Sequence, residues 1–112
     1  MIKNSVRLIG NVGQDPEMIT TDSGRQLARF SVATNESYRK GEEKVETTHW
    51  HDLIAWGKTA ELCGELLKKG SHVAITGKLT YSTYEKDGVS IKRAQVQVTE
   101  FQVLDRKQAE EE

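Results

Sequence analysis

The strongest constraint on the fold is an alternation of apolar and polar residues that runs through most of the sequence and is broken once by a helical spacing. Alternation over several residues predicts a β-strand with one face against the core, particularly where Val, Ile, Thr and aromatic residues are frequent. Turn signals separate five such stretches: residues 6–12, 26–38, 47–56, 71–84 and 89–104. A brief extended segment at residues 18–20 precedes a further turn at 22–24. The sequence therefore predicts a mainly β domain.

The helical spacing lies between the third and fourth of these strands. Apolar residues recur there at Ala60, Cys63, Leu66 and Leu67, with Thr59 as the expected N-cap and Gly70 as the stop. They predict an amphipathic helix of about ten residues. Three strands, a helix and two strands are the order of a five-stranded Greek-key OB-fold barrel, whose helix covers one open end. We therefore expect an all-β OB-fold barrel with one short helix between strands 3 and 4.

Three local features modify this simple pattern. The apolar parity of the last strand shifts between Val98 and Phe101, which indicates a bulge or a strong bend. Gly77 marks a bend in the preceding strand. Residues 39–46 contain Gly41 and six charges, so we expect a mobile loop there.

Length and composition limit the architecture and the location. The 112 residues, 36% hydrophobic and 29% charged, suit one domain, so we expect an OB-fold over 1–104 and a short acidic tail over 105–112. The apolar runs are too short for a transmembrane helix or a signal peptide, and we expect no membrane partner. The single cysteine, Cys63, cannot form an internal disulfide, which fits a reducing cytoplasm.

The charge balance allows a polyanionic partner only at a local site. The formal net charge is −1. Residues 1–104 carry fourteen basic and thirteen acidic groups, a net charge of +1, whereas residues 105–112 carry two basic and four acidic groups, a net charge of −2. A nucleic-acid site must therefore be a patch on the domain, and its binding should depend moderately on salt.

Four aromatic residues are poorly placed for the core of such a barrel: Tyr38, Trp50, Trp56 and Tyr84. Tyr38 ends its strand beside the charged segment, the two tryptophans share a parity with Asp52, and Tyr84 follows a polar parity. Better core candidates are Phe30, Tyr81 and Phe101. Exposed rings among basic residues form a platform on which unpaired bases stack without regard to sequence, although a single aromatic residue is more often a packing residue.

Basic residues near these strands and loops could neutralise phosphates: Arg29, Arg39, Lys40, Lys44, Lys58, Lys69, Lys78, Lys86, Lys92 and Arg93. We expect phosphate contacts mainly from five of them: Arg29, Lys58, Lys69, Lys78 and Lys92.

Four segments of the chain resemble the bacterial single-stranded DNA-binding protein (SSB) family: residues 10–17, 30–38, 48–58 and 67–71. The resemblance extends over about residues 2–104 in one register. It implies a non-catalytic, cytoplasmic and nucleoid-associated homotetramer of OB-folds. Such a protein binds and protects single-stranded DNA, independently of sequence, during replication, recombination and repair.

Position by position, the resemblance also implies roles for individual residues. The stacking aromatics of the family match Tyr38, Trp50, Trp56 and Tyr84. Lys58 and Lys69 match basic positions that can meet the DNA backbone, and His51 matches a histidine at the subunit interface.

The sequence departs from the family pattern in two respects. Asp52 stands where an Arg is common, and Thr80 and Ser82 replace basic residues, so the groove is less positive. Family members recruit replication and repair proteins through an acidic tip with a terminal Phe, whereas this sequence ends at Glu112 with three glutamates. Recruitment of such partners through that tip is therefore not assumed.

Other function classes have weaker support. A protein-interaction OB module of a replication or primosome complex would keep the barrel without the exposed aromatics, and a saccharide site would not need the Lys and Arg residues. His49 and His51 have a spacing at which they could share a metal, but the sequence places no third ligand. Cys63 lies on the apolar face of the helix and is expected to be buried and inert. We expect no catalytic site, metal or cofactor.

Overall fold

The computed structural model describes residues 3–105. Its elements are β1 (Val6–Val12), β2 (Glu17–Thr20), β3 (Gln26–Lys40), β4 (Glu43–Trp56), α1 (Gly57–Leu66), β5 (His72–Lys86) and β6 (Val89–Val103). Five strands pair in the order β1-β5-β6-β4-β3, and β3 also pairs with β1, which closes the barrel. The short β2 adds to the free edge of β3. The predicted five-stranded barrel, with one helix between its third and fourth strands, is confirmed.

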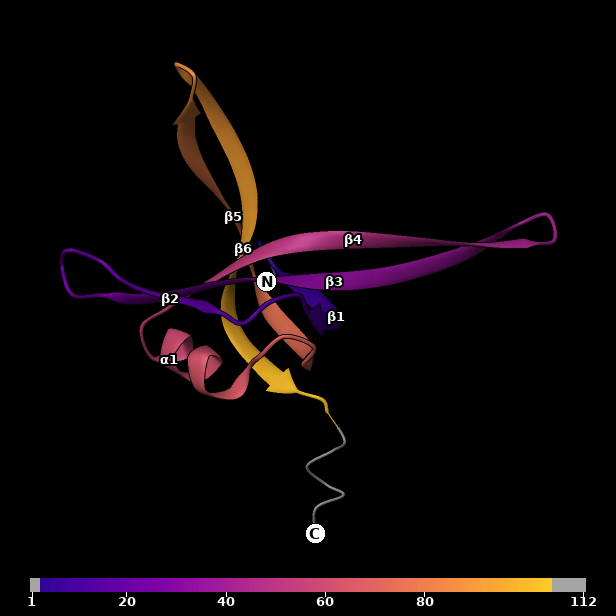
Figure 1. The fold of residues 1–112 in the computed structure, drawn as a ribbon, viewed down its shortest axis with the longest axis horizontal. Helices are drawn as coiled ribbons and strands as arrows, with labels where there is room; N and C mark the ends of the chain where they lie inside the picture. Colours follow the sequence, from indigo (N-terminus) through magenta and orange to yellow (C-terminus); the bar gives the residue numbers. More distant parts are fainter. Residues whose placement is uncertain (1–2, 106–112) are drawn as a thin grey trace, which may run out of the picture.

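Two long hairpins, β3–β4 and β5–β6, project from the barrel in different directions (Figure 1). β4 and β6 are the parallel pair of the barrel, joined at Leu53–Val96 and Ile54–Gln97, and the other neighbours are antiparallel. The pairing between β4 and β6 brings the bases of the two hairpins together.

The core lies inside the barrel, where alternate residues of each strand point inward. Its largest fully buried side chains include Leu53, Ile75, Val32 and Val73. The helix adds Ala60 and Cys63 from one side, followed by Leu67 just beyond its end. The predicted core residue Phe30 is buried and Phe101 packs against the core half-buried.

Closure of the barrel depends on a close approach at Gly10. A Cβ atom at this position would overlap the carbonyl oxygen of Ala33, so β1 can cross β3 there only with glycine. The two strands then pair at Asn11–Ala33 and Val12–Val32.

The bulge in the last strand is confirmed. Thr76 pairs with Glu100 and Gly77 with Val98, so Thr99 is the extra residue of β6. At this bend a Cβ atom on Gly77 would overlap the carbonyl oxygen of Gln97. The extra residue explains why the apolar parity changes between Val98 and Phe101.

The expected mobile loop at 39–46 is wrong. β3 continues to Lys40 and β4 resumes at Glu43, with a tight turn at Gly41, whose φ is 67°. Charge does not prevent pairing here, because the hairpin projects into solvent and both of its faces stay hydrated. Lys40 and Glu43 are also opposite charges in register, which favours the pair.

Two further expectations are corrected. The helix begins at Gly57, not after a cap at Thr59. Trp56 is the N-cap residue and makes no side-chain capping bond, because its indole has no acceptor. Gly57, with φ of 61°, turns the chain directly from β4 into α1. Tyr81, expected in the core, is 57% exposed because its pair with Ala94 lies on the projecting part of the β5–β6 hairpin.

Within residues 3–105, no helix is long and apolar enough to cross a membrane. Of the expected acidic tail, Asp105 is described, and its carboxylate accepts a hydrogen bond from the backbone N–H of His72 at 3.1 Å. Residues 106–112 lie outside the described part.

Candidate nucleic-acid interface

The barrel presents one continuous outward surface across β3, β4, β6 and β5, which we call the outer face. Cross-strand partners of an antiparallel pair lie on the same side of the sheet, so the strand registers decide which side chains belong to it. The pairs Phe30–Leu53 and Leu79–Val96 point inward. The alternating outward positions are Arg29, Ser31, Trp50, Asp52, Lys78, Thr80, Ser82, Tyr84, Arg93 and Gln95.

Trp50 is the most exposed aromatic residue of the outer face, with 62% of its surface accessible. Its cross-strand partner is the small residue Ala33. The ring lies against Gly13 in the β1–β2 connection. A Cβ atom added to Gly13 would come within 3.1 Å of the ring atom Cη2 and within 2.9 Å of the Ser31 hydroxyl, so only glycine leaves room for the ring. Trp50 is therefore held in place by backbone while most of its surface faces solvent.

Trp56 lies on the same side of β4 but is half-buried. The guanidinium carbon of Arg25 lies 4.3 Å from its ring centroid, a cation–π contact. A base can stack on the part of this ring that Arg25 leaves uncovered, or it can stack on the Arg25 guanidinium, which itself lies over the ring.

Tyr84 completes the aromatic residues of the outer face. It is 43% exposed and pairs with Ile91 near the tip of the β5–β6 hairpin. The tip is a two-residue turn, Asp87–Gly88, with positive φ at both positions, which matches the twist of the hairpin.

Tyr38 lies on the opposite side of the β3–β4 hairpin. It pairs with Val45 and continues the inward row that begins at Phe30, but it lies beyond the barrel and is 58% exposed. The structure thus places three of the four aromatic residues expected to stack on the outer face, and Tyr38 across the ribbon from them.

The five selected basic residues do not form a single group. Arg29 and Lys78 lie on the outer face. Lys92 lies on the other side of the β5–β6 hairpin, with its Nζ 5.0 Å from the Tyr81 ring centroid. Lys58 is in α1, 3.9 Å from Glu61, and Lys69 follows α1, where its backbone N–H donates to Asp15 at 2.8 Å.

Two ion pairs form across the outer face. Arg93 Nε donates to Asp52 Oδ2 at 2.7 Å, and Arg29 Nη2 donates to Glu17 Oε1 at 3.3 Å. They border a cavity of about 320 Å³, which we call the polar pocket. Gln14 and Gln95 also line it. The sequence does not indicate that Glu17 and the two glutamines belong to this site. Their proximity depends on the registers of β4 with β6 and of β2 with β3, which cannot be deduced from local sequence patterns.

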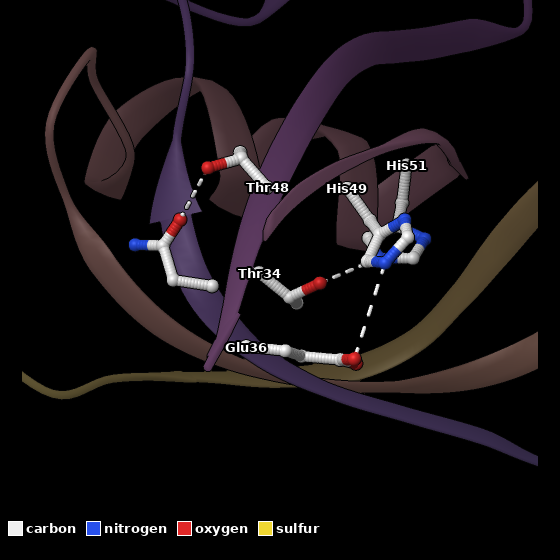
Figure 2. A network of polar contacts seen from close by, with 6 residues as sticks. Thr34, Glu36, Thr48, His49 and His51 are labelled. Carbon is white, nitrogen blue, oxygen red and sulfur yellow. Dashed lines mark hydrogen bonds and ion pairs between the residues drawn. The ribbon is translucent and has the colours of Figure 1, made fainter. Parts of the chain in front are cut away.

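His51 and His49 project together from the inward row of the β3–β4 hairpin (Figure 2). His51 is half-buried and its Nε2 lies 2.9 Å from the hydroxyl of Thr34. His49 Nε2 lies 3.9 Å from Glu36 Oε1. Over residues 3–105, no group of three or more His, Cys, Asp or Glu side chains is arranged to hold a metal ion.

Cys63 is fully buried, and burial raises the pKa of its thiol to about 12. The thiol therefore stays protonated at neutral pH, as the inert role predicted for it requires.

Comparison with known proteins agrees with this geometry. Residues 3–104 match the single-strand binding protein family. The chain belongs to this family. The resemblance expected from the sequence motifs is thereby confirmed.

Named relatives and solved structures give the same result. Single-stranded DNA-binding protein 1 of Chlorobaculum tepidum is 36% identical over 107 residues, which cover 93% of this chain and 66% of that protein. The single-stranded DNA-binding protein of Xanthomonas campestris is 40% identical over 104 residues, which cover 90% and 60%. The Plasmodium falciparum SSB in complex with ssDNA superposes with a TM-score of 0.84 at 26% identity, covering 94% of this chain and 97% of that one. This chain thus spans about 60 to 66% of the length of the two bacterial relatives.

Proposed function

We propose that this chain binds single-stranded DNA independently of sequence, and protects it during replication, recombination and repair. The proposal rests on the position of Trp50, whose ring is 62% exposed on the outer face and is held against Gly13. The second and third barrel strands, here β3 and β4, form the face on which OB-folds bind oligonucleotides, and an exposed, fixed ring on that face is suited to stacking on bases. Family membership and the likeness to an SSB solved with ssDNA support the same function.

The path of the strand follows from the four aromatic residues. Trp50, Trp56 and Tyr84 would receive bases on the outer face, and Tyr38 would receive a base where the strand passes around the β3–β4 hairpin. Arg29 and Lys78 would meet phosphates on that face, while Lys58, Lys69 and Lys92 would meet the strand outside it. The protein would act without catalysis.

We further propose that the chain assembles as a homotetramer. β1 pairs with β5 over Val6–Asn11 but with β3 only at its end, so one edge of Val6–Gly10 has no strand partner among residues 3–105. Ile9, on this strand, is 62% exposed. An open strand edge with an exposed apolar residue is suited to pairing with another subunit, and His51 is the expected contact from the β3–β4 hairpin.

The proposed function also implies where the protein acts and which proteins it meets. A protein that protects single strands would work in the cytoplasm at the nucleoid, in contact with replication and repair proteins.

One observation favours a second candidate function, a protein-interaction module of a replication or primosome complex. An apolar groove of about 380 Å³ lies between α1 and β6, where Leu62 and Leu66 are 37% and 53% exposed. Exposed apolar grooves of this kind can accept a partner protein.

Titration with labelled oligo(dT), beside a duplex of equal length, tests the proposed function. We expect tight binding of the single strand, much weaker binding of the duplex, and weakening with salt. The mass of the same sample, measured by light scattering, tests the tetramer. Failure to bind oligo(dT) at low salt would contradict DNA binding and leave the protein-interaction module as the better function.

A further inference from the structure

The polar pocket on the outer face is lined mainly by charged and hydrogen-bonding side chains. It has a volume of about 320 Å³, at the lower end of the range for small-ligand sites. Its lining includes two carboxylates, two guanidinium groups and two side-chain amides: Glu17, Asp52, Arg29, Arg93, Gln14 and Gln95. Each carboxylate is paired with one arginine, so these six side chains have no net formal charge.

A phosphate inside this pocket would be unfavourable, whereas the Arg29 side chain, 56% exposed, can still meet a phosphate that passes outside it. The carboxylates of Asp52 and Glu17 would repel a phosphate inside the pocket, and the two arginines already donate to them at 2.7 and 3.3 Å. A nucleic-acid base carries no charge and offers both donors and acceptors. The chemistry of the pocket therefore matches a base rather than the backbone.

The pocket lies directly beside the proposed stacking ring. Gly13, which supports the Trp50 ring, precedes Gln14 of the pocket lining. The Ser31–Asp52 pair follows the Ala33–Trp50 pair along the same side of β3 and β4. A strand stacked on Trp50 would thus bring its next nucleotide to the pocket.

The hydrogen-bonding groups of the pocket select among the bases. Guanine has two adjacent N–H donors, at N1 and N2, which suit the two oxygens of a carboxylate, and its O6 and N7 suit an arginine. Each carboxylate oxygen can accept a further hydrogen bond while it holds its arginine. Thymine offers one N–H donor and two carbonyl acceptors, so it would leave most of the carboxylate acceptors unused.

We propose that the polar pocket holds one base beside Trp50 and prefers guanine over thymine, with Asp52 accepting the N1 and N2 protons. This inference rests on the proposed function, since it assumes that a single strand crosses the outer face. It adds a preference at one nucleotide to binding that is otherwise indifferent to sequence.

Three oligonucleotides of about nine nucleotides test the preference, a length within the range that one OB-fold contacts. One is all thymine, one has a single central guanine, and one has hypoxanthine in place of that guanine, which removes only the N2 amino group. A single guanine per strand also prevents association between strands. We expect the guanine strand to bind about fivefold tighter than the thymine strand, with the hypoxanthine strand between them.

Two variants locate the effect. Asp52→Asn should reduce the guanine preference to less than about twofold, because an amide cannot accept both protons. Removing a negative charge also raises the affinity for every strand, so the ratio of affinities is the informative quantity. Glu65→Gln makes the same change of charge at an exposed position of α1, and should keep the preference.

The possible outcomes distinguish the guanine preference from the binding of single-stranded DNA on which it rests. Equal affinity of the wild-type protein for the guanine and thymine strands, with both bound tightly, would overturn the guanine pocket and leave DNA binding intact. A preference that persists in folded Asp52→Asn would overturn the role of Asp52. If that variant does not fold, the hypoxanthine strand with wild-type protein decides the same point. Binding of none of the strands would contradict the proposed function itself.

Discussion

The carboxylate of Asp52 accepts a hydrogen bond from Arg93 Nε at 2.7 Å, which joins β4 to β6 across the outer face. The pair is partly exposed, with 41% of the Asp52 side chain and 59% of the Arg93 side chain accessible. Its contribution to stability is therefore small, about 0 to 1 kcal/mol, and its main consequence is to occupy an arginine where a DNA strand would pass.

Asp52→Ala should make DNA binding stronger and more dependent on salt. Without its partner, Arg93 is free to meet a phosphate, so the plot of log affinity for oligo(dT) against log salt should become steeper by about 0.7, the value for one added contact to a single strand. Titrations of wild type, Asp52→Ala and Glu65→Ala over a range of salt measure this slope. An unchanged slope in folded Asp52→Ala would show that Arg93 does not reach the DNA.

Trp50→Ala should weaken binding of oligo(dT) by about 1 to 3 kcal/mol with the fold unchanged, because it removes one stacking surface. Leu66→Ala is the control, since Leu66 is 53% exposed but lies on α1, outside the outer face. Fluorescence anisotropy with labelled oligo(dT) gives both affinities. Equal losses in the two variants would argue against a specific role for Trp50.

Gly13→Ala tests how Trp50 is positioned. The added Cβ would meet the Trp50 ring and come within 2.9 Å of the Ser31 hydroxyl, so the ring must move. We expect a shift in the tryptophan emission spectrum and weaker binding of oligo(dT), with a smaller loss than Trp50→Ala causes. Unaltered emission and affinity would mean that the ring does not depend on the backbone at Gly13.

The raised pKa of Cys63 predicts a loss of stability in alkali. Burial raises the pKa of the thiol from 9.0 to about 12, so above pH 9 the unfolded chain releases a proton that the folded chain retains. The free energy of unfolding from this group therefore falls as pH rises from 9 toward 12. Urea unfolding of wild type and Cys63→Ala at several pH values isolates the effect, and parallel curves for the two proteins would exclude it.

Much of the fold follows from local pattern, and the exceptions have physical causes. Alternation predicts the five barrel strands because each buries one face. The parity shift between Val98 and Phe101 predicts a bulge or a strong bend, and the structure has a bulge there, with Thr99 as the extra residue. The β3–β4 hairpin exceeds its predicted length because its end is solvated on both sides, where polar residues pair as readily as apolar ones. The helix start at Gly57 depends on a positive φ, which a search for side-chain caps does not detect.

The candidate site was less predictable than the fold. Parity along β4 places Trp50 and Trp56 on one side, as the structure has them. Tyr38 shares the parity of Phe30 and therefore lies across the ribbon from Trp50, but its exposure depends on the hairpin extending beyond the barrel, which the charged sequence did not indicate. The meeting of Asp52 and Arg93 depends on the pairing of β4 with β6, whose strands are far apart in the chain.

Quenching of Trp50 fluorescence by single-stranded DNA tests directly whether bases stack on the outer face. In Trp56→Phe, Trp50 is the single remaining tryptophan of the 112 residues, so its emission reports on the outer face alone. We predict strong, saturable quenching by oligo(dT), reversed by salt, and little change with duplex. Tight binding of oligo(dT) without quenching of Trp50 would contradict stacking of the strand on the outer face.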